Sequence, residues 1–330
     1  MFDQRIQEGR IHDCHGDLHS GNIVVDNGKI YIFDCIEFNK RFRFCDVASD
    51  IGFLAMDLDV QNQPYLSSHL IDQYVKTSND AGIFSVLNFY KSYRAYVRGK
   101  VIGFQLSDPT IETAKKQEIS TTAKKYFDLS RYYTALFSLN LSLHKPFLFL
   151  VSGLSGTGKS TVALKIAVDY HASQINTDIV RKQLAGIDTY EKHHDMFNTG
   201  LYDPKNVDVT YEKVIENAAG LLKQKENVVL DATFQKRKYR DMAQKISKDH
   251  NAVCIMILCV CPDTVVKSRL EERVKKKSIS DGRWEIYLSQ KETYEPFTIH
   301  EPYLQIDTAN TSYQYRMGFF NTLLSKIQET

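Results

Sequence analysis

The sequence has few cysteines and little net charge, and each shortage excludes a class of protein. Six cysteines in 330 residues, with no Cys-x-x-Cys pair, exclude a disulfide framework and give no sign of a zinc site. The 42 Lys and Arg residues against 40 Asp and Glu residues leave a net charge of +2, which provides no general field for nucleic acid or anionic lipid. A patch that binds phosphate must therefore be local.

Long apolar segments are also lacking. The longest apolar runs have about nine residues, whereas ~18 are needed to span a bilayer, and residues 1–10 lack the apolar stretch of a signal peptide. We therefore expect no membrane segment and a location in a reducing cytoplasm. Hydrophobic residues at 43% and charged residues at 25% are ordinary values for folded chains. The length is about twice that of a ~150-residue domain, which predicts two domains.

The first part of the chain combines short strand-like runs with a helical region. Within residues 11–60, the apolar runs 22–25 and 30–33 are joined by Asp26-Asn27-Gly28-Lys29, and Asn-Gly between such runs predicts a hairpin. Residues 61–141 repeat apolar side chains at spacings of three and four, which predicts helices. We interpret this stripe as core rather than as a ligand site; its members are Phe89, Tyr93, Tyr96, Val97, Tyr126, Leu129, Tyr132, Tyr133 and Leu136.

From residue 147 onward, apolar strands alternate with amphipathic helices. The expected strands are 147–152, 173–176, 227–231, 253–261 and 304–307, and the expected helices are 159–169, 209–223, 238–248 and 264–275. This alternation predicts an α/β fold with a parallel sheet covered on both faces. We divide the chain into a mostly helical domain of residues 1–141 and a three-layer α/β domain of residues 142–330.

Residues 153–160 read Gly-Leu-Ser-Gly-Thr-Gly-Lys-Ser and match the phosphate-binding pattern GxxxxGK[ST] in full. The motif follows a strand and opens a helix, so backbone N–H groups and the helix N-terminus face one phosphate position. We expect Lys159 to reach the β- and γ-phosphate oxygens of ATP and the Ser160 hydroxyl to hold Mg²⁺. The predicted nucleotide-binding residues are Gly153, Leu154, Ser155, Gly156, Thr157, Gly158, Lys159, Ser160 and Thr161.

Charged residues that follow two other strands supply further groups for phosphoryl transfer. Asp178 and Arg181 come just beyond the strand 173–176, where a carboxylate can take the proton of an acceptor hydroxyl and a guanidinium can bind phosphate. The alternative is a helix N-cap followed by a solvated arginine. Asp231 ends its strand and is placed to hold Mg²⁺ or to bind the acceptor.

Two arginines are predicted to lie on one helix face. Arg269 and Arg273 are four residues apart, and the lysine run 275–277 follows them. Two guanidinium groups that face the same way can clamp a triphosphate and neutralise charge on the group being transferred. The alternative is ordinary pairing along the helix with Glu271 and Glu272.

Residues ~146–320 resemble the P-loop kinases of the polynucleotide-kinase and zeta-toxin type. The resemblance rests on GLSGTGKS, NTDIVRKQL, VVLDATF and RLEERVKKKSISDGRWE. It implies that Asp178 is the general base, that Arg181 lies on the acceptor side, and that Arg269 and Arg273 are lid residues that bind ATP phosphates.

A second phosphotransfer motif lies near the N-terminus. His15-Gly16-Asp17-Leu18-His19-Ser20-Gly21-Asn22 has the HxDxxxxN spacing of a kinase catalytic loop. The predicted hairpin brings Asn22 and Asp34 to the same end, about one strand spacing of ~5 Å apart, where both could hold Mg²⁺. Asp17 would then orient an acceptor hydroxyl.

This motif resembles the C-terminal lobe of aminoglycoside phosphotransferases, in which Asp46 and Asp50 match supporting acidic positions. Such kinases hold ATP with an N-terminal lobe that carries a Gly-rich loop and a strand lysine, whereas only 14 residues precede His15 here. The whole chain resembles bacterial fusions of an aminoglycoside-phosphotransferase-like domain with a P-loop kinase domain, with the first lobe lost.

These patterns predict an ATP-dependent kinase that acts through residues 142–330 on a hydroxyl acceptor, most readily a small molecule. An ATP-binding regulatory module with slow ATPase activity, a polynucleotide 5′-hydroxyl kinase and an active N-terminal domain stay open as alternatives. A nucleic-acid acceptor is not favoured, because a strand-binding groove needs a basic stripe with stacking aromatics and the dense basic run lies in the predicted lid. We expect the acceptor pocket near Asp178 and residues 189–205.

Overall fold

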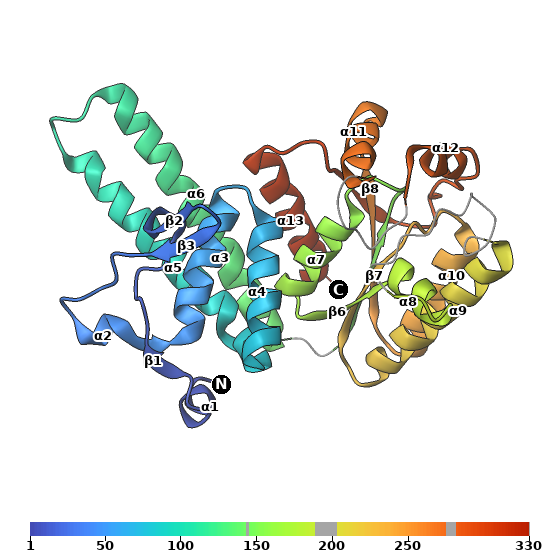
Figure 1. Ribbon diagram of the computed structural model, residues 1–330, viewed down its shortest axis with the longest axis horizontal. Coiled ribbons are helices and arrows are strands. Elements are labelled where there is room, and N and C mark those ends of the chain that lie inside the picture. Colours follow the sequence, from blue (N-terminus) through green and yellow to red (C-terminus); the bar gives the residue numbers. More distant parts are fainter. Residues whose placement is uncertain (143–144, 189–202, 275–281, 330) are drawn as a thin grey trace. The chain divides into compact units, whose positions relative to one another are not determined.

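The computed structural model describes residues 1–142, 145–188, 203–274 and 282–329. The chain divides into two compact units, Met1–Ser142 and Leu143–Thr330. Figure 1 shows that helices dominate the first unit and that a sheet runs through the second.

The first unit opens with α1 (Phe2–Gln7) and two small antiparallel pairs of strands. β1 (Ile11–Asp13) pairs with β4 (Phe44–Asp46), which follows α2 (Lys40–Arg43). β2 (Ile23–Asp26) pairs with β3 (Lys29–Ile32), and the two turn residues between them, Asn27 and Gly28, have positive φ angles of 48° and 76°. The predicted hairpin is therefore confirmed.

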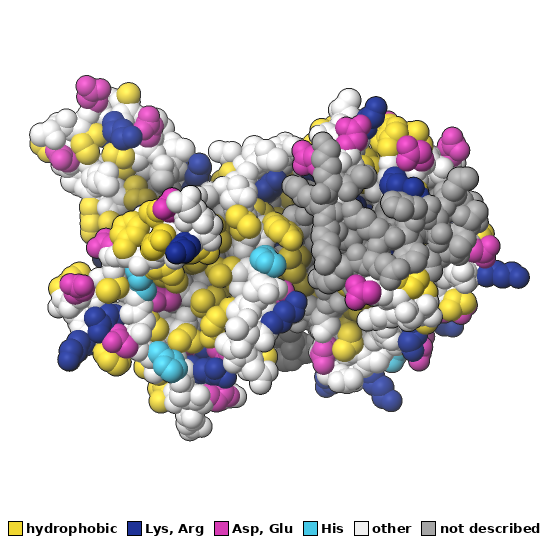
Figure 2. All heavy atoms as spheres, viewed as in Figure 1, with side chains coloured by type: hydrophobic (Ala, Val, Ile, Leu, Met, Phe, Trp, Pro, Cys, Tyr) yellow, Lys and Arg dark blue, Asp and Glu magenta, His cyan; other side chains and the backbone are white. Residues whose placement is uncertain are grey.

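Hydrophobic side chains of this hairpin are largely exposed. Val25 is 69% exposed, Ile30 68% and Ile32 54%, and Figure 2 shows hydrophobic side chains gathered on the surface there. The hairpin therefore contributes little to the core of the first unit.

Four long helices build the core of the first unit: α3 (Val47–Val60), α4 (Pro64–Ser78), α5 (Phe84–Phe104) and α6 (Thr113–Ser142). The sequence predicted short strand-like runs within residues 11–60 and did not identify α3. Asp46 caps this helix by accepting a hydrogen bond from the Ala48 N–H, and Phe53 and Met56 on one helix face are buried.

The aromatic stripe of the first unit is only partly core. Its second half is buried, with Tyr133 and Leu136 fully covered, whereas Phe89, Tyr93 and Tyr96 in the first half are 38–55% exposed. Helical spacing identifies a shared face, but how much of that face is covered depends on the neighbouring helices.

The second unit contains a five-stranded sheet of order β6-β7-β5-β8-β9, in which all neighbours are parallel. The strands are β5 (Phe147–Ser152), β6 (Ala172–Asn176), β7 (Asn227–Asp231), β8 (Val253–Val260) and β9 (Tyr303–Asp307). The predicted α/β fold with a parallel sheet is therefore confirmed.

Helices cover both faces of this sheet (Figure 1). Leu148 and Leu150 of β5 pack into a cluster with residues of α9 (Pro204–Lys223) and α10 (Arg237–Asp249). Side chains alternate along a strand, so Phe149 points the other way and contacts Tyr170, just after α7 (Lys159–Asp169), with ring centroids 5.0 Å apart. On that side Lys165 of α7 lies over the Phe320 ring of α13 (Tyr313–Gln328).

Three further helices follow the carboxyl ends of strands: α8 (Thr177–Leu184), α11 (Asp263–Val274) and α12 (Trp284–Glu292). None of the helices in the described ranges combines the length and the hydropathy that a bilayer crossing requires.

Candidate functional site

The glycine-rich loop connects β5 to α7, as its sequence predicts. Gly153 has a φ of 143°, and a Cβ atom there would lie 2.5 Å from the carbonyl oxygen of Cys259. Gly158 has a φ of 84° and is the N-cap of α7. Only glycine adopts both conformations without strain, so the loop can turn tightly and place the N-terminus of α7 at its centre.

Neighbouring connections hold this loop in place. The Gly153 N–H and the Ser152 hydroxyl both donate to the Thr233 carbonyl oxygen, at 3.3 and 2.9 Å. On the other side, the Thr308 hydroxyl donates to the Thr157 carbonyl oxygen at 2.7 Å. The loop is thus anchored by the residues that follow β7 and β9, which organises its backbone before any ligand arrives.

Lys159 is close to two carboxylates and one guanidinium. Its Nζ donates to the Leu154 carbonyl oxygen at 2.9 Å. Burial lowers the pKa of Lys159, the charges of Asp231 and Asp178 oppose this, and Arg273 adds to the lowering. The structure therefore brings together Lys159, Asp178, Asp231 and Arg273, which the sequence predicted to act at one site.

Asp231 ends β7 beside the loop. It is 2% exposed and accepts hydrogen bonds from Asn176 Nδ2 at 2.6 Å and from Gln174 Nε2 at 3.3 Å. The nearby Ser160 hydroxyl and the Lys159 charge also favour its ionised form. Burial raises the pKa of Asp231 despite these partners. A hydroxyl and a carboxylate are the hard oxygen donors that Mg²⁺ prefers, so Ser160 and Asp231 fit the predicted ion.

Further ligands for such an ion would come from phosphate and water. Among the residues that the structure describes, no three His, Cys, Asp or Glu side chains form a group that could hold a metal ion. Mg²⁺ commonly binds through one or two protein groups together with substrate phosphates, so the pair Ser160 and Asp231 is sufficient.

Asp178 lies in the first turn of α8, but it does not cap the helix. Asn176 is the N-cap, and its Oδ1 accepts from the N–H groups of Asp178 and Ile179 at 2.8 and 3.3 Å. The alternative role of Asp178 as a cap is therefore wrong. Its carboxylate instead pairs with Arg181 Nη1 at 2.5 Å.

The two predicted lid arginines have different surroundings. Arg269 donates from Nη1 to the Thr308 hydroxyl and from Nη2 to the Thr308 carbonyl oxygen, both at 2.8 Å. Burial lowers the pKa of Arg273, and the nearby charges of Asp178 and Asp231 oppose that shift. Arg273 thus lies near the carboxylates of Asp178 and Asp231, whereas Arg269 ties α11 to the end of β9. The lysine run 275–277 lies outside the described residues.

Two residues that the sequence did not identify also belong to this site. Thr308 joins the loop to Arg269, and its position just after a parallel strand was the available signal. Gln290 of α12 accepts a hydrogen bond from the Ser155 N–H at 2.9 Å, and both residues are buried. Sequence offers no signal for Gln290.

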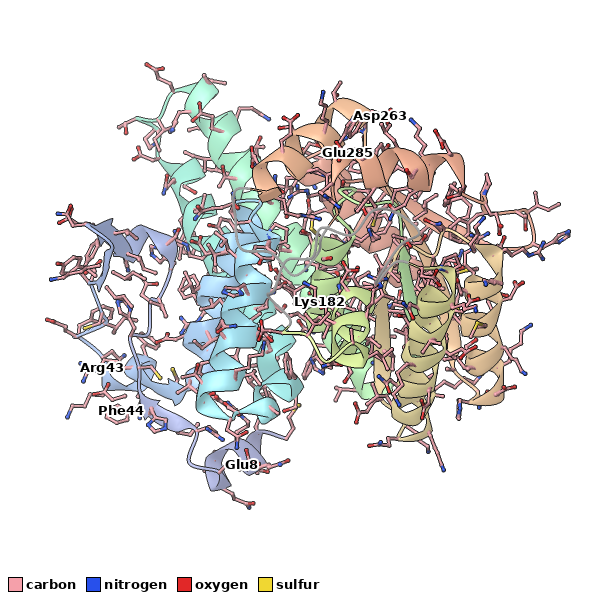
Figure 3. The ribbon with its side chains drawn as sticks, turned by 45° about the vertical axis from the view of Figure 1, so that its right-hand side comes forward. Glu8, Arg43, Phe44, Lys182, Asp263 and Glu285 are labelled. Carbon is pink, nitrogen blue, oxygen red and sulfur yellow. The ribbon has the colours of Figure 1, made fainter. Side chains whose placement is uncertain are left out.

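Contacts between α11 and α12 position Gln290. Asp263 of α11 accepts hydrogen bonds from the Tyr287 hydroxyl and from Lys291 Nζ of α12, each at 2.7 Å. Figure 3 labels Asp263 and Glu285 on these two helices. A shift of either helix would therefore be felt at the phosphate-binding loop.

The acceptor pocket was expected near Asp178 and residues 189–205. Of that range, residues 189–202 lie outside the described residues. Asp203 is the N-cap of α9 and accepts from the Lys205 N–H at 2.9 Å.

In the first unit, the motif around Asp17 forms a well-defined loop. The N–H groups of His15 and Gly16 donate to the Asp50 carboxylate at 2.7 and 3.1 Å, and Asn22 Nδ2 donates to the Asp17 carbonyl oxygen at 3.0 Å. The Phe33 N–H donates to the Asn22 carbonyl oxygen, which places Asp34 one residue past that pair. The roles of Asp17, Asn22 and Asp34 in catalysis and metal binding stay predictions.

Comparison with known proteins supports the interpretation of the second unit. Residues 148–297 match the model of a family described as an AAA domain. This match agrees with the P-loop geometry of the second unit. Because the match begins at residue 148, it does not test the resemblance of residues 1–141 to aminoglycoside phosphotransferases.

The chain is 30% identical over 273 residues to uncharacterized proteins of Mycobacterium tuberculosis and Mycobacterium bovis, which covers 83% of this chain and 52% of each relative. The chain thus spans about half the length of the curated relatives it matches.

Solved structures with a similar arrangement include a gluconokinase from Sinorhizobium meliloti, with a TM-score of 0.38 and 19% identity over 56% of this chain and 96% of that one. Another is the APS kinase of Mycobacterium tuberculosis in complex with AMPPNP and APS, with a TM-score of 0.37 and 15% identity over 56% of this chain and 99% of that one.

Proposed function

We propose that the P-loop domain is an ATP-dependent kinase that transfers the γ-phosphate of ATP to a hydroxyl group of a small molecule. The observation that carries the proposal is the buried Asp231 carboxylate at the end of β7, beside Lys159 and Ser160 of the glycine-rich loop. A P-loop hydroxyl and lysine beside a buried carboxylate are the groups that phosphoryl transfer uses for its ion and phosphates.

The phosphates bind where the loop N–H groups and the N-terminus of α7 converge. Lys159 donates to the β- and γ-phosphate oxygens in place of its present partner, the Leu154 carbonyl oxygen. Ser160 and Asp231 hold Mg²⁺, which neutralises phosphate charge when it is bound. Arg273 adds positive charge where the transferred group becomes more negative.

Asp178 serves as the general base. The acceptor oxygen attacks the γ-phosphorus, the bond between that phosphorus and the bridging oxygen of ADP breaks, and the hydroxyl proton passes to the Asp178 carboxylate. The ion pair with Arg181 at 2.5 Å holds that carboxylate in position. It also places a guanidinium next to the incoming acceptor.

A screen with γ-labelled ATP tests this proposal on the whole protein. Candidate acceptors are sugars and sugar acids, nucleosides, aminoglycosides and polynucleotide 5′ ends. We expect label to move to one small-molecule class. Release of free phosphate with no labelled acceptor would support the regulatory ATPase instead, and label on polynucleotide ends would support the nucleic-acid kinase.

A variant of the proposed base separates transfer from binding. Asp178→Asn is expected to lower the transfer rate by about 10²-fold or more while ATP still binds, because the amide cannot accept the proton. Asp241→Asn is the matched control, since Asp241 is exposed on α10 with 54% of its side-chain surface accessible. Equal activity of the two variants would remove Asp178 from the mechanism.

A further inference from the structure

Two cysteines meet where β1 and β4 pair. Cys45 lies opposite His12 in the register, and the Cys14 N–H donates to the Arg43 carbonyl oxygen at 2.9 Å, which continues the pairing past the end of β1. Side chains alternate along a strand, so His12 and Cys14 share a face and Cys45 shares it with them. Cys14 and Cys45 are therefore diagonal neighbours on one face. Figure 3 labels Arg43 and Phe44, the two residues that precede Cys45.

The two side chains are in contact. The Cys14 thiol donates to the Cys45 carbonyl oxygen at 3.5 Å, and each thiol shifts the pKa of the other. Both residues are partly buried, which leaves them open to a small reagent. Diagonal neighbours lie ~7–8 Å apart and a disulfide needs Cα atoms about 4.4–6.8 Å apart, so the bond forms with a small closing movement of the two strands.

We propose that Cys14 and Cys45 are a redox-reactive pair that forms a disulfide when the protein meets a peroxide. This modification site is separate from the proposed kinase chemistry and does not depend on it.

The surroundings assign different roles to the two thiols. The hydrogen bond from Cys14 lowers the pKa of Cys45, burial and the Asp50 charge oppose this, and Arg94 contributes further lowering, with a net lowering. The same interaction raises the pKa of Cys14, which keeps its proton. Cys45 therefore supplies the nucleophilic thiolate and Cys14 the resolving thiol.

The chemistry balances with hydrogen peroxide as the oxidant. The Cys45 thiolate attacks one peroxide oxygen, the O–O bond breaks, and Cys45 sulfenic acid forms together with hydroxide, which becomes water on protonation. The Cys14 sulfur then attacks the Cys45 sulfur, and the sulfenic oxygen leaves as water with the Cys14 proton. Two thiols are oxidised to one disulfide, and one peroxide is reduced to two waters.

The bond would join two structural features of the first unit. Cys14 directly precedes His15, whose N–H donates to Asp50, and Cys45 directly precedes Asp46, which binds Arg5. Oxidation would covalently tie the start of the loop that contains Asp17 to β4. We expect the oxidised first unit to unfold at a higher temperature, because the crosslink constrains the unfolded chain.

The sequence makes the disulfide straightforward to detect. Trypsin places Cys14, Cys35 and Cys45 on separate peptides, residues 11–29, 30–40 and 44–76. The full chain is treated with hydrogen peroxide, alkylated and digested without reductant. We expect peptide 11–29 linked to peptide 44–76, with two hydrogens lost and the link removed by dithiothreitol. Alkylated Cys14 and Cys45 alongside oxidised Cys35, which is exposed, would overturn the proposal.

Serine variants test the order of the steps. In Cys14→Ser, Cys45 sulfenic acid should accumulate and be trapped by dimedone, whereas in Cys45→Ser the residue Cys14 should stay reduced. Cys35→Ser is the matched control and should form the link at the wild-type rate. Thermal unfolding under reducing conditions checks that each variant folds. The crosslink experiment on the wild-type protein needs no variant, so it decides the question even if a variant does not fold.

Discussion

In the first unit, buried charged side chains form ion pairs with oppositely charged side chains. Beside the glycine-rich loop of the second unit, the buried carboxylate of Asp231 has neutral hydrogen-bond partners instead. Arg5 is 2% exposed and binds Asp46 and Asp80, with N–O distances of 2.7 and 2.5 Å. Lys91, 1% exposed, pairs with Asp59 at 2.7 Å. In the second unit, Asp231 is equally buried, but its hydrogen bonds come from the neutral side chains of Asn176 and Gln174.

The pKa shifts express this difference. Burial opposes the charge of Arg5, yet its hydrogen bonds with Asp46 and Asp80 raise its pKa overall, and those from Arg5 and Tyr74 lower the pKa of Asp80. Burial dominates in the second unit, where it lowers the pKa of Lys159 and raises that of Asp231. Groups whose charged forms are disfavoured mark a place where a charged ligand is expected, whereas fully paired groups hold the fold.

The largest expected effect separates the two phosphotransfer motifs. Lys159→Ala should lower the rate of phosphoryl transfer by about 10³-fold, because it removes the cation that contacts the phosphates. Asp17→Asn in the first unit should leave that rate unchanged. Transfer of label from ATP measures both. The reverse outcome would assign the activity to the first unit.

Breaking a matched charge should damage stability rather than turnover. Arg5→Met leaves Asp46 and Asp80 buried without their cation, which should cost about 3–5 kcal/mol of unfolding free energy. Urea unfolding followed by circular dichroism measures this. Arg43→Met is the matched control and should change little, because its pair with Asp13 is exposed. Equal losses of unfolding free energy in the two variants would show that the buried ion pairs contribute no more to stability than the exposed one.

Removal of the Asp231 charge should raise stability, which is the opposite of the effect expected for Arg5→Met. Because the folded-state pKa of Asp231 is raised, its ionisation destabilises the fold as the pH rises above the ordinary range of Asp, near ~4. Without nucleotide or Mg²⁺, Asp231→Asn should therefore raise the melting temperature at pH 8 while it abolishes transfer. The gain should shrink as the pH falls toward 4. A lower melting temperature at pH 8 would show that the charge is compensated.

The smallest effect concerns the contact between α12 and the loop. Gln290→Met removes the acceptor of the Ser155 N–H but keeps the length of the side chain, at a cost of about 1 kcal/mol. We expect ATP affinity to change several-fold, with calorimetric titration as the measurement. Gln244→Met on α10, away from the loop, is the control. An unchanged affinity in Gln290→Met would show that this contact does not shape the nucleotide site.

Local patterns in the sequence determined much of the second unit. All five strands of the sheet were expected near their observed bounds, because an apolar run between turn residues and helices has few other ways to be buried. The glycine-rich loop followed from its spacing alone, since its backbone conformation requires glycine at defined positions. The hairpin turn at Asn27 and Gly28 follows from the same conformational rule.

Helices without a clear apolar periodicity were harder to predict from the sequence. The sequence did not identify α3, α8, α12 or α13 as separate helices. Within α3, small and acidic residues such as Ala48, Asp50 and Asp57 are buried, so the apolar periodicity is weak. Burial of these residues depends on partners elsewhere in the first unit, for example the His15 and Gly16 N–H groups that bind Asp50.

The sequence by itself determined where the glycine-rich loop lies, and only the tertiary structure decided which residues surround it. Ser155 and Gln290 form a hydrogen bond although they are 135 positions apart in the sequence, and Arg269 binds Thr308, which lies 39 positions away. The sequence predicted one role for Arg269 and Arg273, yet in the fold Arg269 binds Thr308 and Arg273 lies near Asp178 and Asp231. A motif depends on local backbone geometry, whereas a contact between distant side chains exists only once strands and helices have packed.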